Sequence, residues 1–169
     1  NVLENDEIPA ITTPYFNFFE LDVLCRMGKL TEVLDKIRSY WGGMLDLGAV
    51  TFWEEYDPSV PKEEQYDMYG DHFGKSLCHA WAASPIYFLA KYFAGLDLVN
   101  KDGVTYVLKP QMQYFTDLDC ILPVGSDGTV RLAWDGECLE VIADAEGGVL
   151  ELGEEKISLV RGETRRVKI

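Results

Sequence analysis

Residues 51–84 bring aromatic rings, carboxylates and imidazoles closer together than any other stretch of the chain. The stretch reads TFWEEYDPSVPKEEQYDMYGDHFGKSLCHAWAAS and contains both histidines of the protein, His72 and His79. Aromatic faces cover the apolar side of a sugar ring, while carboxylates and imidazoles hydrogen-bond hydroxyl groups and transfer protons. The composition therefore favours a carbohydrate-binding cleft with acid–base chemistry. The alternative is a buried aromatic cluster beside a solvated acidic loop.

Glu54 is the first candidate for proton transfer in this stretch. A general base must be ionised at working pH without being masked by a salt bridge, and the neighbouring aromatics Trp53 and Tyr56 can set that balance. Glu55, the next residue in the sequence, is the alternate candidate for the general base. Since Asp57 follows closely, a purely solvated acidic loop also stays open.

The histidines and cysteines do not form a recognisable metal or thiol site. The cysteines are Cys25, Cys78, Cys120 and Cys138. No pair of them has C-x-x-C spacing, and we expect all four to be reduced. A zinc site from His72, Cys78 and His79 lacks ordinary ligand spacing. A cysteine nucleophile paired with His79 is equally unsupported, because adjacent residues rarely aim at one point. We therefore expect no metal and no cofactor.

Composition and charge narrow the class of protein and of partner. The chain has 169 residues, of which 47% are apolar and 12% aromatic, as in a packed globular protein. Its net charge of −14 leaves no basic face for a nucleic acid. No run of 18 apolar residues is present, so we expect no membrane insertion. The acidity suits neutral or cationic ligands.

The first half of the chain has the periodicity of amphipathic helices. We predict helices from Pro14 to Gly28, from a Thr31 cap to Gly48, and from a Ser84 cap to Gly95. The Gly42-Gly43 pair can end or kink the second helix earlier. Each predicted helix has one apolar stripe. The stripe of the first helix is Phe16, Phe19, Val23, Leu24 and Met27, that of the second is Val33, Ile37, Tyr40, Trp41 and Met44, and that of the third is Ile86, Leu89, Ala90 and Phe93.

After Gly95 the pattern changes to short alternating runs. Asp-Gly or Gly-Gly turns at 102–103, 127–128, 135–136 and 147–148 separate these runs. The runs cover 104–110, 120–124, 129–134, 138–144, 149–152 and 165–169. They predict five or six short antiparallel strands in a small sandwich. The boundary between the halves should lie close to residues 95–103.

The predicted helices have more apolar surface than a small sheet domain can cover. Amphipathic helices bury their stripes against other elements, and too few are predicted here to cover one another. We therefore expect an α+β chain in two segments that forms the C-terminal end of a larger protein. The expected partner of the uncovered stripes is the remainder of the parent chain or a second copy through self-association.

Three segments resemble the family 78 glycoside hydrolases, the bacterial α-L-rhamnosidases. They are TPYFNFFELDVLCRMG (13–28), YWGGMLDLGAVTFWEEYDP (40–58) and GKSLCHAWAASPIYFLAKYFAGL (74–96). The resemblance implies that residues 1–97 are the C-terminal helical part of an (α/α)6 toroid, the catalytic domain of six helical hairpins. It also implies that residues 98–169 form a small C-terminal β-sandwich.

The resemblance further implies an inverting hydrolysis that removes terminal α-L-rhamnose from a glycoside or polysaccharide. The family's Trp-Glu motif falls on Trp53 and Glu54, which makes Glu54 the general base and Trp53 a pocket residue beside Tyr56. His79 matches a histidine that contacts the sugar. The general acid belongs to an earlier acidic motif that this chain lacks, so the isolated fragment is expected to be inactive.

Other interpretations stay open at this point. The chain can instead be a noncatalytic carbohydrate-binding or interaction module, and His79 a satisfied core histidine. Tyr15 and Asn17, at a helix entry, could touch substrate. We expect Trp41 and Trp81 to be core residues, Trp134 to pack beneath the β domain, and His72 to lie on a loop. The bacterial cytoplasm and the periplasm are both compatible with the sequence.

Overall fold

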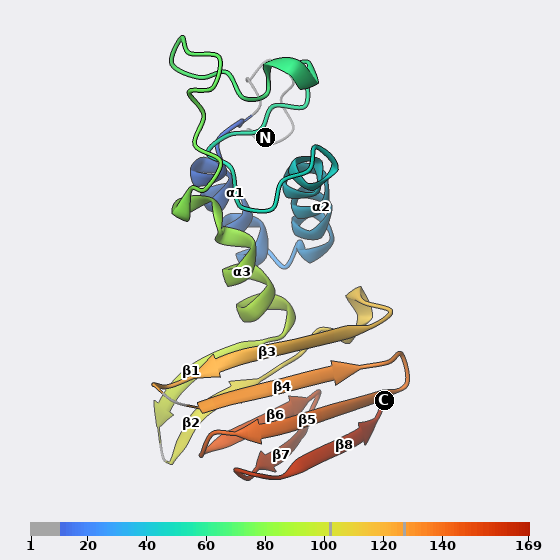
Figure 1. Cartoon of the computed structure of the whole chain (residues 1–169). Helices are drawn as coiled ribbons and strands as arrows, with labels where there is room; N and C mark the ends of the chain where they lie inside the picture. The colour runs from blue at the N-terminus through green and yellow to red at the C-terminus, as the bar shows by residue number, and fades with distance from the viewer. Residues whose placement is uncertain (1–10, 102, 127) are drawn as a thin grey trace. The chain divides into compact units, whose positions relative to one another are not determined.

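The computed structural model describes residues 11–101, 103–126 and 128–169. The chain divides into two compact units, Asn1–Ile86 and Tyr87–Ile169 (Figure 1). The first is helical with long loops, and the second contains the strands. The fold is therefore α+β with a β-sandwich. The finer assignment of 1–97 and 98–169 as two domains stays a prediction. No helix in the described ranges has the length and apolar content needed to cross a membrane.

Two helices form the framework of the first unit. Helix α1 covers Pro14–Arg26 and α2 covers Leu30–Asp46. Pro14 occupies the start of α1, where its missing N–H is not needed. The predicted Thr31 cap is wrong, because Lys29 holds the N-cap position and Thr31 lies inside α2. The Gly42-Gly43 pair neither ends nor divides α2.

The two helices bury their side chains differently. The α2 stripe is buried as predicted around Val33, Trp41 and Met44, whereas most of the predicted α1 stripe is exposed. Phe16 is 59% and Phe19 51% exposed. The buried residues of α1 are Pro14, Asn17, Leu21, Leu24 and Cys25. Periodicity alone does not show which stripe finds a partner, and here α1 turns a narrower stripe toward the interior.

The third predicted helix is shorter and irregular. Helix α3 covers Ser84–Phe88 and continues into a π-helical segment, η4, over Leu89–Phe93. A π turn rotates the following side chains relative to an α-helix. Of the predicted stripe, Phe93 is buried whereas Ile86 is 61% and Leu89 38% exposed, so the stripe is only partly correct.

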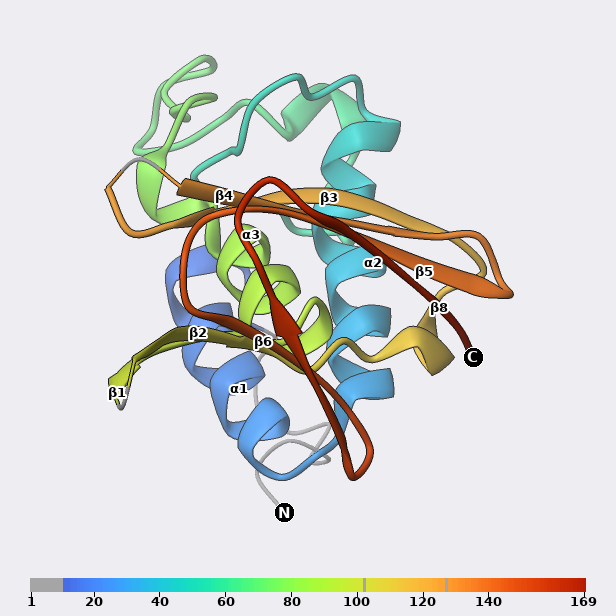
Figure 2. The same cartoon turned by 90° about the horizontal axis from the view of Figure 1, so that it is seen from below.

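The second unit is a sandwich of two four-stranded sheets. Sheet one has the order β1-β2-β6-β7 and sheet two the order β3-β4-β5-β8. Figure 2 shows the strands of the two sheets in separate layers. The strands are β1 Leu96–Lys101, β2 Val104–Leu108, β3 Leu118–Val124, β4 Gly128–Trp134, β5 Cys138–Asp144, β6 Gly148–Leu152, β7 Glu155–Leu159 and β8 Thr164–Lys168.

This sandwich differs from the predicted one in three respects. The described residues form eight strands rather than five or six, because β1 and β7 were not predicted. The pair β2–β6 is parallel, so the sandwich is not purely antiparallel. The predicted turn at 147–148 connects β5 of one sheet to β6 of the other instead of closing a hairpin. The predicted turns at Asp102 and Asp127 fall on positions that lie outside the described residues.

Both sheets contribute to one apolar core in the second unit. Tyr106, Leu108 and Leu150 from one sheet and Val130, Leu132, Leu139 and Val141 from the other are fully buried. Trp134 also belongs to this core, as predicted, and its indole N–H donates to the Phe115 carbonyl at 3.3 Å.

Each of the four cysteines is a free thiol. Burial raises the pKa of Cys25 to about 11, which keeps that thiol protonated.

Candidate functional site

Two segments of the long loop pair like short strands and bring Glu54 close to His79. The Glu54 N–H donates to the Ser76 carbonyl at 2.9 Å, and the His79 N–H donates to the Phe52 carbonyl at 2.8 Å. The Thr51 hydroxyl adds a bond to the Leu77 carbonyl. This pairing connects residues more than twenty positions apart, and it is the local structure on which the candidate site depends.

The Glu54 carboxylate is held by one bond on each oxygen. Its Oε1 accepts from the Tyr69 hydroxyl at 2.7 Å, and its Oε2 accepts from the Ser76 N–H at 3.1 Å. The His79 Nδ1 lies 3.8 Å from Oε2. The Tyr69 bond, followed by the Ser76 N–H, His79 and Lys75, lowers the pKa of Glu54 although burial opposes this. Glu54 is therefore ionised at neutral pH while only 7% exposed.

Glu55 is engaged elsewhere. Its Oε1 accepts from the Thr12 hydroxyl at 2.7 Å, and its Oε2 lies 4.0 Å from the buried Lys75 ammonium. Burial lowers the pKa of Lys75 against the attraction of the surrounding carboxylates. The Thr12 carbonyl also accepts the Tyr56 N–H at 3.0 Å. Together, the bonds of Glu55 and Tyr56 to Thr12 attach the loop to the segment before α1. Only Glu54 of the two is next to His79.

His79 lies against an exposed indole. Its ring centroid is 4.2 Å from that of Trp81, which in turn is 5.5 Å from the Tyr15 ring. Trp81 is 52% exposed, so the prediction of a core residue is wrong. The reason is local: Ala80–Ala82 is a 3₁₀ turn rather than part of a helix, and its indole is not on a buried stripe.

Trp53 and Tyr56 lie in the framework that supports Glu54. Trp53 is 3% exposed and its ring packs 5.6 Å from Tyr66. The Tyr56 ring lies 5.6 Å from Tyr40 and so close to Gly43 that a β-carbon there would overlap it. Contact of either ring with a substrate stays a prediction. Trp41 is buried as predicted, and its indole N–H donates to the Ala82 carbonyl at 2.8 Å.

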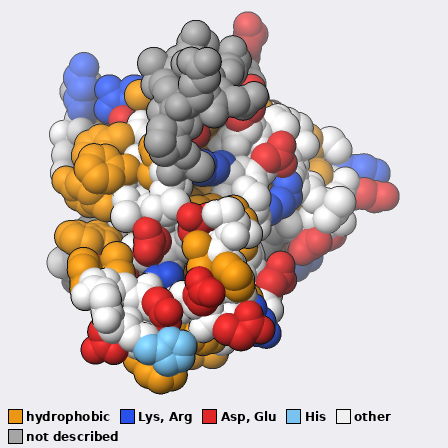
Figure 3. Space-filling view, turned by 90° about the horizontal axis from the view of Figure 1, so that it is seen from above, with side chains coloured by type: hydrophobic (Ala, Val, Ile, Leu, Met, Phe, Trp, Pro, Cys, Tyr) orange, Lys and Arg blue, Asp and Glu red, His pale blue; other side chains and the backbone are white. Residues whose placement is uncertain are grey.

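The remaining candidates are placed as follows. Asn17 is fully buried, whereas Tyr15 is 45% exposed beside Trp81. His72 is on an exposed part of the loop, and its Nδ1 lies 2.6 Å from Asp67 Oδ1. No cluster of three metal-binding side chains occurs within the described ranges. Figure 3 shows Asp and Glu side chains gathered around a histidine on the loop face of this unit. Such a surface suits neutral or cationic molecules.

Tyr69 and the exposed Trp81 were missed as site residues by the sequence analysis. Tyr69 reaches Glu54 across a sequence separation of fifteen residues. The available signal was Gly70 between Tyr69 and Asp71, since glycine in a polar loop is compatible with a tight turn. Nothing in that pattern indicates where the phenol points.

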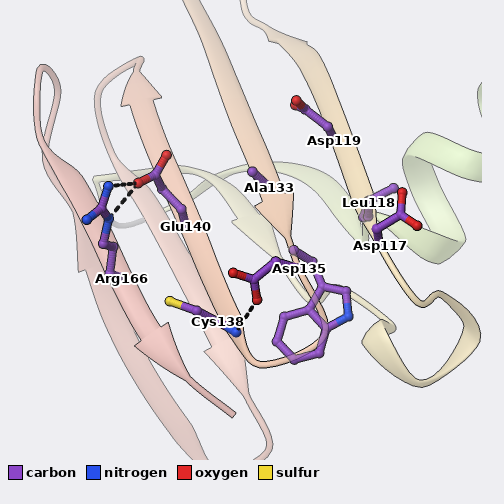
Figure 4. Close-up of a pocket in the computed structure, with 9 residues that line it drawn as sticks. Asp117, Leu118, Asp119, Ala133, Asp135, Cys138, Glu140 and Arg166 are labelled. Atoms are coloured by element: carbon purple, nitrogen blue, oxygen red, sulfur yellow. Dashed lines mark hydrogen bonds and ion pairs between the residues drawn. The ribbon is translucent and has the colours of Figure 1, made fainter.

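A hollow of about 490 Å³ lies on sheet β3-β4-β5-β8 of the second unit. Asp119, Ala133, Glu140 and Arg166 are register partners across it. Figure 4 shows Arg166 bonded to Glu140 and the Cys138 N–H bonded to Asp135. Asp119 is likewise paired with Arg131 at 2.6 Å. Since Asp119, Glu140 and Arg166 are engaged in these ion pairs, we assign the hollow no ligand.

Comparisons with known proteins give a structural relationship. No protein-family model matches the sequence, and no curated protein matches it. The fold is similar to the crystal structure of the GH78 family rhamnosidase of Bacillus sp. GL1, with a TM-score of 0.67 and 23% sequence identity. The match covers 89% of this chain and 16% of that one. At 23% identity, this similarity shows a shared fold and nothing more.

Proposed function

We propose that this chain is the C-terminal part of an inverting α-L-rhamnosidase, with Glu54 as its general base. The observation that carries the proposal is an ionised, nearly buried carboxylate beside His79 and an exposed indole. The fold likeness to a GH78 rhamnosidase supports the same assignment. In this proposal the helical part, residues 1–97, completes an (α/α)6 toroid and residues 98–169 are its C-terminal β-sandwich.

The proposed chemistry is a single displacement at the anomeric carbon. Glu54 takes a proton from a water molecule, whose oxygen forms the new bond to that carbon from the face opposite the leaving group. The glycosidic C–O bond breaks, and a carboxylic acid about 6.5–9.5 Å from Glu54 gives its proton to the leaving oxygen. That acid is proposed to lie in the parent protein outside this sequence.

His79 and Trp81 are proposed to hold the sugar near Glu54. An imidazole can donate to a ring hydroxyl, and the exposed indole face beside it can cover the apolar side of a pyranose. His79 also has a nitrogen 3.8 Å from Glu54 Oε2, so sugar binding and the base are structurally linked. The exposed Tyr15 ring extends the same aromatic surface.

His79→Ala in the parent enzyme is expected to weaken transition-state binding by about 1–3 kcal/mol, because a sugar hydroxyl loses its hydrogen-bond partner. The measurement is kcat/KM on an aryl α-L-rhamnoside, with thermal unfolding recorded in parallel. Trp134→Phe, a change of a buried aromatic residue in the core of the second unit, serves as the control. A fall in thermal stability without any change in kinetics would show that His79 is a core residue.

The product's configuration tests the proposed reaction. The complete reading frame that contains this sequence should release rhamnose from an aryl α-L-rhamnoside, and proton NMR at early times should show the β-anomer first. Retention of the α-configuration would contradict a water-activating Glu54. No hydrolysis of any rhamnoside would contradict the proposed function.

A noncatalytic carbohydrate-binding module is the second candidate. The observation that favours it is the exposed Tyr15–Trp81 pair, since aromatic faces bind sugars without any turnover. Both candidates predict that rhamnose perturbs Trp81, so binding alone does not separate them. Only the enzyme requires Glu54 and an acid from the parent protein, which makes the hydrolysis assay decisive.

A further inference from the structure

Tyr69 combines high exposure with a specific bond to the buried carboxylate. Tyr69 is 79% exposed, yet its hydroxyl donates to Glu54 Oε1 at 2.7 Å. An exposed aromatic ring gains little from burial. Its position on Glu54 therefore calls for an explanation other than core packing.

The backbone at Tyr69 is held in an uncommon conformation. Met68 and Asp71 exchange both backbone hydrogen bonds, at 3.0 and 2.9 Å, around a two-residue turn. Tyr69 has φ +57° and Gly70 φ +80°, the signs of a type I′ turn. Asn and Gly are the residues that favour the first of these positions. A bulky aromatic residue there is an outlier of the kind that accompanies functional sites.

The base of this turn is rigidly closed. The Lys75 N–H donates to the Tyr66 carbonyl at 3.1 Å, and the Gly74 N–H donates to the Asp71 carbonyl at 3.2 Å. A β-carbon at Gly74 would overlap the Met68 carbonyl, so only glycine fits at position 74 with this backbone. These contacts fix the direction in which the turn presents Tyr69.

We propose that Tyr69 is a positioning residue for the general base, a role that rests on the proposed function of Glu54. The phenol holds Oε1 while the Ser76 N–H holds Oε2, so the two donors define the orientation of the carboxylate. A base held in this way points its free lone pairs in fixed directions toward the attacking water. The turn maintains its unfavourable backbone because it delivers this donor.

The same bond affects the protonation of Glu54. A phenol donates more strongly to a carboxylate than to a carboxylic acid, and this favours the ionised form. The bond is the largest cause of the lowered pKa of Glu54 and raises the pKa of Tyr69. In the native protein the base thus stays ionised further into acid than an unpartnered glutamate. Removal of the phenol must raise the pKa of Glu54, so the acid limb of the kcat/KM profile moves to higher pH.

The test uses two substitutions at Tyr69. Tyr69→Phe removes only the hydroxyl, whereas Tyr69→Asn also removes the ring and introduces a residue that the turn favours. In both variants we expect the Glu54 carboxyl resonance of this chain to titrate at higher pH by ¹³C NMR. In the complete enzyme we expect kcat to fall about tenfold, the loss of one hydrogen bond to a charged group. Tyr69→Asn should lower the unfolding temperature less than Tyr69→Phe, because asparagine favours this turn position.

Tyr66→Phe is the matched control. It removes a phenol from the same loop, and among the described residues the donors to Glu54 are Tyr69 and Ser76 only. The control should change neither the Glu54 titration nor kcat. An unchanged Glu54 titration in both Tyr69 variants would overturn the proposal, as would equal losses of stability and activity in Tyr69→Asn. If the complete enzyme hydrolyses no rhamnoside, the proposed function fails, while the NMR titration still decides whether Tyr69 controls Glu54.

Discussion

Glu54→Gln in the complete enzyme is expected to lower kcat on an aryl α-L-rhamnoside by about 10²–10⁴-fold, the usual contribution of a general base. The amide retains the shape of the carboxylate and one oxygen that can accept from Tyr69, but it cannot take a proton from water. KM should change little, because the sugar contacts assigned to His79 and Trp81 are preserved. The measurement is steady-state kinetics at the pH optimum of the native enzyme.

Glu55→Gln is the matched control for this substitution. It changes the adjacent carboxylate, which bonds Thr12 and lies 4.0 Å from Lys75, and should affect stability more than kcat. Azide offers a second check, since a small anionic nucleophile needs no general base and should restore part of the Glu54→Gln activity. If Glu54→Gln stays active while Glu55→Gln does not, the assignment of the base is wrong by one residue.

The isolated 169-residue chain is expected to hydrolyse the same rhamnoside at least about 10²-fold more slowly than the complete enzyme. The reason follows from the proposal, in which the proton donor for the leaving oxygen and the rest of the pocket belong to the parent protein. The measurement compares the two proteins at equal molar concentration. Equal rates would show that the acid lies within this sequence.

Supplying the remainder of the parent as a separate polypeptide is the control for this comparison. The exposed α1 stripe, Phe16, Phe19, Val23 and Met27, is the surface that we expect it to cover. Recovery of activity on mixing would show that the isolated chain is correctly folded but incomplete. Light scattering should show self-association of the chain alone, and its loss on mixing.

The regular elements could be predicted wherever a local pattern determines them. Pro14 and Gly28 mark the limits of α1, and the alternation of 138–144 matches β5. Strands β1 and β7 lacked such a pattern, because each is largely exposed and does not alternate cleanly. Their pairing depends on partners distant in sequence. The π turn after α3 was missed because such turns are rare interruptions of an otherwise α-helical pattern.

The candidate site could be predicted only in part. Glu54 and His79 were identified, and the structure places them 3.8 Å apart. Their roles in catalysis and binding stay predictions. Tyr69 could not be identified, because its contact requires a positive φ that the sequence favours only weakly at tyrosine. Trp81 was misassigned as a core residue, whereas it lies on a 3₁₀ turn and is 52% exposed.

Gly43 illustrates how a helix residue can depend on a loop residue. Gly43 lies in the last turn of α2, which covers Leu30–Asp46. Within a helix, glycine is less favourable than alanine by about 1 kcal/mol. The Tyr56 ring occupies the space that a β-carbon at position 43 would need. Positions 43 and 56 therefore cannot vary independently. In homologues, a larger residue at position 43 should occur together with a smaller one at position 56. The two positions should therefore covary, although one lies in α2 and the other in the segment that carries Glu54.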